Sequence, residues 1–167
     1  MLPFRKLATA DVKPFMNAVP LLDVKVAAGG FSPDQVVSDD LGEYDWVELT
    51  GRTKPAKDIF VAQVVGESMN RQIRNGAYCV WRLRPAGTRQ GKTVLAQHRD
   101  LQDPESGARY TVKVYESEKE QFDDGTWRHR RIRLKPSSND PSFGTLEFAD
   151  LEEGELEIVA ELVEVLT

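Results

Sequence analysis

The chain has 167 residues, of which 40% are hydrophobic and 29% charged, a composition typical of one globular domain. Its formal net charge of −5 argues against nucleic acid as a partner of the chain as a whole, so we expect no direct DNA binding. The single cysteine, Cys79, excludes an internal disulfide. No apolar run approaches the roughly 20 residues that cross a membrane, and we expect a cytoplasmic protein.

The N-terminal segment, up to about Leu22, carries Pro3, Pro14 and Pro20 and shows no helical or strand period. We therefore expect an extended, loosely attached arm, without a helix-turn-helix. Such a beginning resembles a tail more than a domain start, and the chain is equally consistent with a fragment of a longer protein. A short strand is predicted over 21–26.

Small residues follow that predicted strand, in the order Ala27-Ala28-Gly29-Gly30. Glycine and alanine give a thin backbone that bends easily. The ordinary interpretation is a flexible linker, and the alternative is a peptide thin enough to lie in a proteolytic cleft. We divide the chain into an arm with this loop (1–31) and a β domain (32–167).

The β domain is predicted from short runs rich in β-branched and aromatic residues, separated by turn residues. Asp123-Asp124-Gly125 predicts the tip of a long hairpin. No long helical pattern and no internal repeat is present. We therefore predict a mainly β fold, a compact domain of twisted antiparallel sheets, with strands over 44–49, 59–65, 78–83, 93–98, 110–115, 127–134 and 156–166.

Ser68 stands directly after one of these strands, in Gly66-Glu67-Ser68-Met69. A serine hydroxyl is a poor nucleophile unless a base lies beside it. The usual base is histidine, but the chain has only two. The segment also lacks the second glycine and the following helix of a hydrolase elbow. The sequence therefore argues against a Ser-His-Asp triad.

Lys113 lies in the middle of the strand predicted at 110–115, 113 − 68 = 45 residues after Ser68. Side chains alternate along a strand, so Lys113 shares a face with Thr111 and Tyr115, opposite two valines. If that face meets solvent, Lys113 is an ordinary surface lysine. If it is buried, the charged amine is disfavoured and a neutral lysine can accept the Ser68 proton. The alternation leaves both interpretations open.

Three stretches taken in order narrow the choice: Val-Ala-Ala-Gly near the N-terminus, Gly-x-Ser-Met after a strand, and a central lysine in Tyr-Thr-Val-Lys-Val. Together they resemble the LexA and UmuD family of self-cleaving serine peptidases, over roughly Pro20 to Leu166. The resemblance implies a LexA C-terminal-domain-like fold and a Ser-Lys dyad. It assigns Ser68 as nucleophile, Lys113 as base, Ala28–Gly29 as scissile bond, and the Glu67 and Ser68 N–H groups as oxyanion donors.

The resemblance also implies a role in a DNA-damage (SOS-like) or phage-defence response. The implied partners are a second copy, bound through the C-terminal strand, and a RecA-like filament as co-protease or a defence-system protein. The chain departs from the family pattern because it has no DNA-binding head and its Ser-to-Lys spacing is stretched near 102–109. Similar domains also occur appended to helicases. Two alternatives remain: a non-proteolytic dimerisation or binding module, and a peptidase that acts in trans.

Two further patterns have ordinary explanations. Gly87 to Thr93 resembles a phosphate loop but is one residue short and precedes a strand instead of a helix. The basic run Arg128 to Arg133 is explained by a solvated strand face. No cysteine–histidine cluster has metal-ligand spacing, so we expect no metal and no cofactor.

Overall fold

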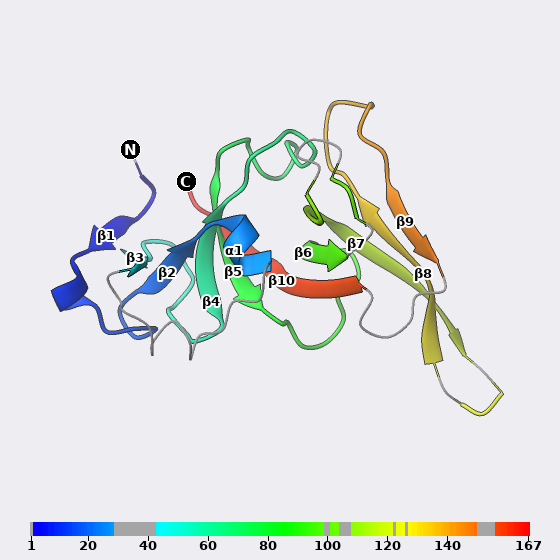
Figure 1. Ribbon diagram of the computed structural model, residues 1–167, viewed down its shortest axis with the longest axis horizontal. Helices are drawn as coiled ribbons and strands as arrows, with labels where there is room; N and C mark the ends of the chain where they lie inside the picture. Colours follow the sequence, from blue (N-terminus) through cyan, green and yellow to red (C-terminus); the bar gives the residue numbers. More distant parts are fainter. Residues whose placement is uncertain are drawn as a thin grey trace.

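The computed structural model describes residues 2–28, 43–98, 101–103, 108–121, 123–125, 127–149 and 156–167. The strands of these residues form one ten-stranded sheet in the order β1-β3-β2-β4-β5-β10-β6-β7-β8-β9 (Figure 1). Every neighbouring pair is antiparallel except β2 and β4, which are parallel. The prediction of a mainly β, largely antiparallel fold is therefore confirmed.

The elements follow one another along the chain with few helical interruptions. The helical elements whose bounds lie in the described residues are the short 3-10 helix η1 (Thr9–Asp11) and α1 (Val24–Ala28). The strands are β1 (Arg5–Leu7), β2 (Val19–Leu22), β3 (Asp45–Glu48), β4 (Ile59–Gln63), β5 (Tyr78–Leu83), β6 (Thr93–His98), β7 (Tyr110–Gln121), β8 (Trp127–Lys135), β9 (Leu146–Ala149) and β10 (Leu156–Val165).

Most predicted strands are present within one or two residues of their bounds, and β7 is longer than predicted. The strand predicted over 21–26 is wrong, because β2 ends at Leu22 and α1 begins at Val24. Asp23 causes this change: its Oδ1 accepts a hydrogen bond from the Lys25 N–H at 2.8 Å, an N-cap that starts a helix. β9 was not predicted, because it is a short strand at the edge of the sheet.

The loosely attached arm is not confirmed for residues 2–22. Phe4 and Phe15 are buried, and their rings contact Tyr78 and Trp46 edge-to-face at 4.9 Å and 5.5 Å between centroids. β2 lies inside the sheet, between β3 and β4. Pro20 lies opposite Trp46 of β3, and pairing with β4 begins at the next residue. The first residues of the chain therefore belong to the core.

The twisted sheet builds two hydrophobic cores. The larger lies around β2 to β5 and includes Phe60 and Trp81, both with no more than 1% of their surface exposed. The smaller lies under the β7–β8 hairpin, which reaches beyond the rest of the sheet in Figure 1. Its buried members are Val94, Ala96, Leu101, Tyr115, Ile132 and Leu134. β6 and β7 each have one face in the larger core and the opposite face in the smaller core, so these two strands connect the cores.

β10, the C-terminal strand, runs between β5 and β6. It pairs with β6 from Leu156 to Glu161 and with β5 from Ala160 to Val165. Both sides of β10 are paired at Ala160 and Glu161, whereas 156–159 and 162–165 each have a strand partner on one side among the described residues. None of the helices in that part of the chain is long and apolar enough to span a membrane.

Candidate active site

The loop that carries Ser68 continues directly from β4. Val64 still bonds toward the β5 side, donating to the Ala77 carbonyl at 2.9 Å and accepting from the Gly76 N–H at 2.7 Å. The chain then turns at Gly66, whose φ of 125° is a conformation that glycine adopts readily and other residues rarely adopt. This turn carries Ser68 away from the sheet and into the cleft described below.

Polar side chains hold the loop in this shape. The Gly66 N–H donates to Asn75 Oδ1 at 2.8 Å, while the Glu67 carboxylate accepts from the side-chain amides of Asn75 at 3.2 Å and Asn70 at 3.0 Å. Behind the loop, the Ser137 N–H donates to the Ser68 carbonyl at 2.9 Å. The backbone around the hydroxyl is thus fixed on both sides, a requirement for a nucleophile that must meet its base in one geometry.

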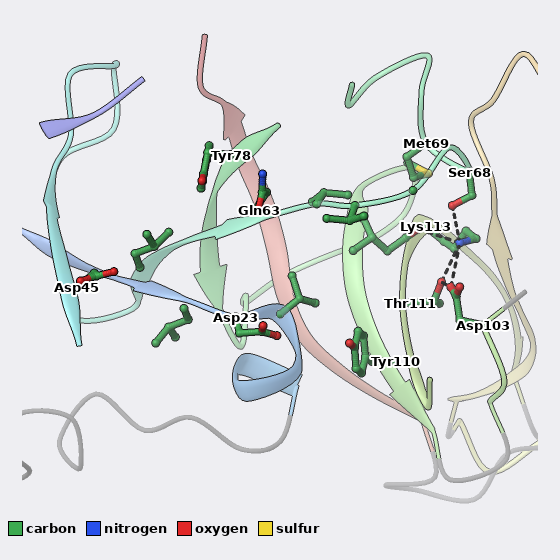
Figure 2. A pocket seen from close by; sticks show the side chains of 17 residues that line it. Asp23, Asp45, Gln63, Ser68, Met69, Tyr78, Asp103, Tyr110, Thr111 and Lys113 are labelled. Atoms are coloured by element: carbon green, nitrogen blue, oxygen red, sulfur yellow. Dashed lines mark hydrogen bonds and ion pairs between the residues drawn. The ribbon is translucent and has the colours of Figure 1, made fainter. Parts of the chain in front are cut away.

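Lys113 points its amine at this hydroxyl. Its Nζ lies 3.0 Å from Ser68 Oγ, 2.8 Å from Thr111 Oγ1 and 3.1 Å from the Val112 carbonyl oxygen (Figure 2). Only 1% of Lys113 and 8% of Ser68 is exposed. The interpretation of Lys113 as an ordinary lysine on a solvent-exposed strand face is therefore wrong. Thr111, Lys113 and Tyr115 do share a face, and all three are buried.

An aspartate completes the group. Asp103 Oδ2 lies 3.7 Å from Lys113 Nζ and accepts the Thr111 hydroxyl at 2.6 Å. Burial disfavours the ammonium form of Lys113, whereas the neighbouring carboxylate favours it. These two effects act in opposite directions on the charge of the Lys113 amine. Asp103 therefore belongs to the site through its own charge.

A cleft of about 710 Å³ runs away from the dyad (Figure 2). Ser68 and Lys113 lie at one end of it and Asp45 lies toward the other. Burial, followed by the charges of Asp23 and Asp103, raises the pKa of the cleft residue Tyr110. The remaining lining residues are Leu21, Leu22, Val24, Gln63, Val64, Val65, Gly66, Met69, Tyr78, Thr111 and Val112.

Two expected oxyanion donors, the backbone N–H groups of Glu67 and Ser68, belong to the loop that carries the nucleophile. The neighbouring Gly66 N–H is occupied by Asn75 and is not available for that role. The expected scissile bond is placed only in part. Ala28 ends α1, has 4% of its surface exposed and does not line the cleft. Gly29 lies outside the described residues.

The remaining sequence motifs play no part in the site. Burial raises the pKa of the Cys79 thiol to about 12, which is the behaviour of an inert packing residue. Arg133, from the basic run, pairs with Glu118 and Glu147 at 2.9 Å and 3.0 Å. The described residues contain no group of histidine, cysteine and carboxylate side chains that could hold a metal.

Sequence reasoning missed the part played by two residues. Alternation along the strand predicts that Thr111 lies on the same face as Lys113. It does not predict the hydrogen bond between the two side chains. Asp103 lies ten residues before Lys113, in the segment before β7, and no periodicity relates the two. Only the packing of that segment against β7 brings the carboxylate to the amine. Comparison with known proteins adds no further assignment, since neither a protein-family model nor a curated protein matches the chain.

Proposed function

We propose that this chain is a serine endopeptidase with a Ser68–Lys113 dyad, which cleaves its own chain between Ala28 and Gly29. The observation that carries the proposal is the 3.0 Å contact between Lys113 Nζ and Ser68 Oγ, made by a lysine that is 1% exposed. A buried lysine is costly to keep, and a serine hydroxyl at its amine gives it a chemical use.

The reaction is an acyl transfer. Neutral Lys113 takes the Ser68 proton while Oγ attacks the Ala28 carbonyl carbon, and the Glu67 and Ser68 N–H groups stabilise the oxyanion. The carbon–nitrogen bond then breaks as the Lys113 ammonium protonates the departing Gly29 amine. Water, deprotonated by Lys113, attacks the ester and releases Ser68 together with a new carboxylate on Ala28.

The cleft supports an extended peptide as the substrate. β2 ends at Leu22, so among the described residues β4 has no strand partner on that side beyond Ala62. Because Val64 bonds toward β5, the backbone groups of the next residue, Val65, point the opposite way. The Val65 side chain is also 77% exposed. A peptide can therefore add as a strand beside residues 63–66 and bring a carbonyl to Ser68.

Incubation of the purified protein at alkaline pH tests this proposal. Intact mass measurements should show an N-terminal fragment ending at Ala28 that grows with time in wild type but not in Ser68→Ala or Lys113→Ala. Ser142→Ala and Lys92→Ala are the matched controls, since both residues are partly or fully exposed and distant in sequence from the site. A folded wild type that stays intact, or equal cleavage in the Ser68 variant, contradicts it.

A specific observation favours cleavage in trans as the second candidate. Asp23 and Val24 form part of the cleft wall, and residues 24–28 are helical. In cis cleavage the same segment would have to serve both as part of the cleft wall and as the bound substrate. Mixing wild type with a tagged Ser68→Ala chain separates the two, because trans cleavage cuts the tagged chain. The non-proteolytic module remains the outcome if neither chain is cut.

The resemblance of the chain to the LexA and UmuD family implies that self-cleavage would act as a switch in a DNA-damage or phage-defence response within the cytoplasm. A RecA-like filament or a defence protein would promote it, and a second copy would pair through the end of β10. Faster cleavage with a filament assembled on single-stranded DNA, and a dimer mass lost on Leu162→Pro, are the expected results. An unchanged rate and a monomer mass would leave the peptidase without these partners.

A further inference from the structure

The hydrogen bonds around Thr111 have a defined direction. Asp103 as a carboxylate has no hydrogen to give, so the 2.6 Å contact with Thr111 is donated by the threonine hydroxyl. This length lies in the range of a charge-assisted O–H···O⁻ bond. The hydroxyl has one hydrogen, and Asp103 holds it. The Thr111 oxygen therefore accepts a hydrogen from Lys113, at 2.8 Å, and has none to donate in return.

This direction determines where the lone pair of a neutral Lys113 points. A neutral amine has two hydrogens and one lone pair, and two of the hydrogen-bond contacts described above are pure acceptors: the Thr111 oxygen at 2.8 Å and the Val112 carbonyl at 3.1 Å. The third direction leads to Ser68 Oγ at 3.0 Å, where the lone pair is needed. A Thr111 hydroxyl released from Asp103 would be able to rotate and donate into that lone pair.

The charge of Asp103 acts on the same nitrogen in another way. At 3.7 Å from Nζ, the carboxylate stabilises the ammonium and makes the neutral amine harder to form. Other titratable groups of this region are Tyr110 and Tyr115 on β7, His98 on β6, Asp23 before α1 and Glu67 in the nucleophile loop. Lys113 forms an ion pair with Asp103, at 3.7 Å between Nζ and Oδ2.

We propose that Asp103 is a positioning residue of the dyad: it fixes the Thr111 hydroxyl so that Lys113 faces Ser68, and its charge keeps Lys113 protonated near neutral pH. The dyad is thereby aligned but inactive until the pH rises or the carboxylate loses its charge. This inference rests on the proposed function for its biological meaning, but the ionisation of Lys113 can be measured without any cleavage.

The first test follows the Lys113 amine directly, by NMR of lysine labelled at Cε, in a Ser68→Ala chain that stays intact. Asp103→Asn keeps an acceptor for Thr111 but loses the charge, so the titration midpoint of Lys113 should fall by about 1 to 3 pH units. Asp103→Glu should restore it. Asp58→Asn removes one charge from an exposed ion pair with Arg82 and should leave the midpoint in place.

The second test uses the pH profile of self-cleavage. Asp103→Asn should move the profile toward lower pH by the same amount and leave the alkaline plateau within about 2-fold of wild type, because alignment is kept. Asp103→Ala should move the profile equally and also lower the plateau, by about 10-fold, because Thr111 is released. Thr111→Val should lower the plateau while Thr111→Ser rescues it.

The outcomes separate this inference from the proposed function. An unchanged Lys113 midpoint in both Asp103→Asn and Asp103→Ala overturns the inference, whatever the cleavage assay shows. A shifted midpoint in a chain that never cleaves refutes the peptidase and leaves Asp103 as the residue that sets the charge of Lys113. A lowered plateau in Asp103→Asn equal to that in Asp103→Ala contradicts the positioning role, since the asparagine still accepts from Thr111.

Discussion

Cleavage at Ala28–Gly29 requires α1 to unwind, because peptidases bind their substrates extended and Ala28 ends a helix. At its N-terminus α1 is held by the capping bond from the Lys25 N–H to Asp23 Oδ1 at 2.8 Å and by the bond from the Ala27 N–H to the Asp23 carbonyl at 3.0 Å. Both end on Asp23. Ala27 and Ala28 must also leave the core, where they are 0% and 4% exposed. The cap is therefore the most direct place to shift this equilibrium.

Replacing Asp23 by alanine removes the cap, at a cost of about 1 kcal/mol to the helix. If unwinding precedes cleavage, its equilibrium constant and the observed rate should both rise about 5-fold. Asp23→Ser is the matched control, since serine caps a helix and yet removes the same charge from the cleft. Both variants are compared by the growth of the fragment ending at Ala28, measured by mass at alkaline pH.

The result that refutes this reasoning is a cleavage rate that stays at the wild-type value in both Asp23→Ala and Asp23→Ser. In that case the unwinding of α1 does not limit the reaction. A rate that rises equally in both variants would assign the effect to the lost charge next to Tyr110 and not to the helix.

Three further predictions concern the frame around the site. Burial raises the pKa of the Cys79 thiol to about 12, well above its ordinary value, so very little of it is thiolate at neutral pH. A thiol reagent should therefore label Cys79 only after unfolding, and rapid labelling of the folded protein would contradict this. Gly66→Ala should cost about 1 to 3 kcal/mol in a denaturant titration and slow cleavage, because alanine is strained at a φ of 125°. Burial by itself would raise the pKa of Glu164, but hydrogen bonds from Thr53 and Arg52 outweigh it and lower the pKa. Glu164→Gln should therefore lower the free energy of unfolding by about 1 kcal/mol at neutral pH, and the difference should shrink as the pH falls through the folded pKa of this carboxyl; a difference that grows in acid would contradict the assignment.

Local patterns were sufficient for most of the strands and for the relative direction of the site residues. β-branched runs such as 59–65 and 78–83 bury both faces, so their composition alone predicts strands. Alternation along 110–115 places Thr111 and Lys113 on one face, because successive side chains of a strand point to opposite sides. The N-terminal residues were misjudged because their prolines disrupt any local period, whereas Phe4 and Phe15 find partners far away in the sequence.

The sequence by itself therefore determined a mainly β chain, the position of Ser68 after a strand, and the face that Lys113 shares with Thr111. Only the tertiary structure decided that this face is buried, because a period of two reports relative direction and not which side the rest of the chain covers. It also brought Asp103 to the amine and folded Val24–Ala28 into a helix beside the cleft. These are contacts between distant segments, and their energies depend on the packed sheet instead of on neighbours along the chain.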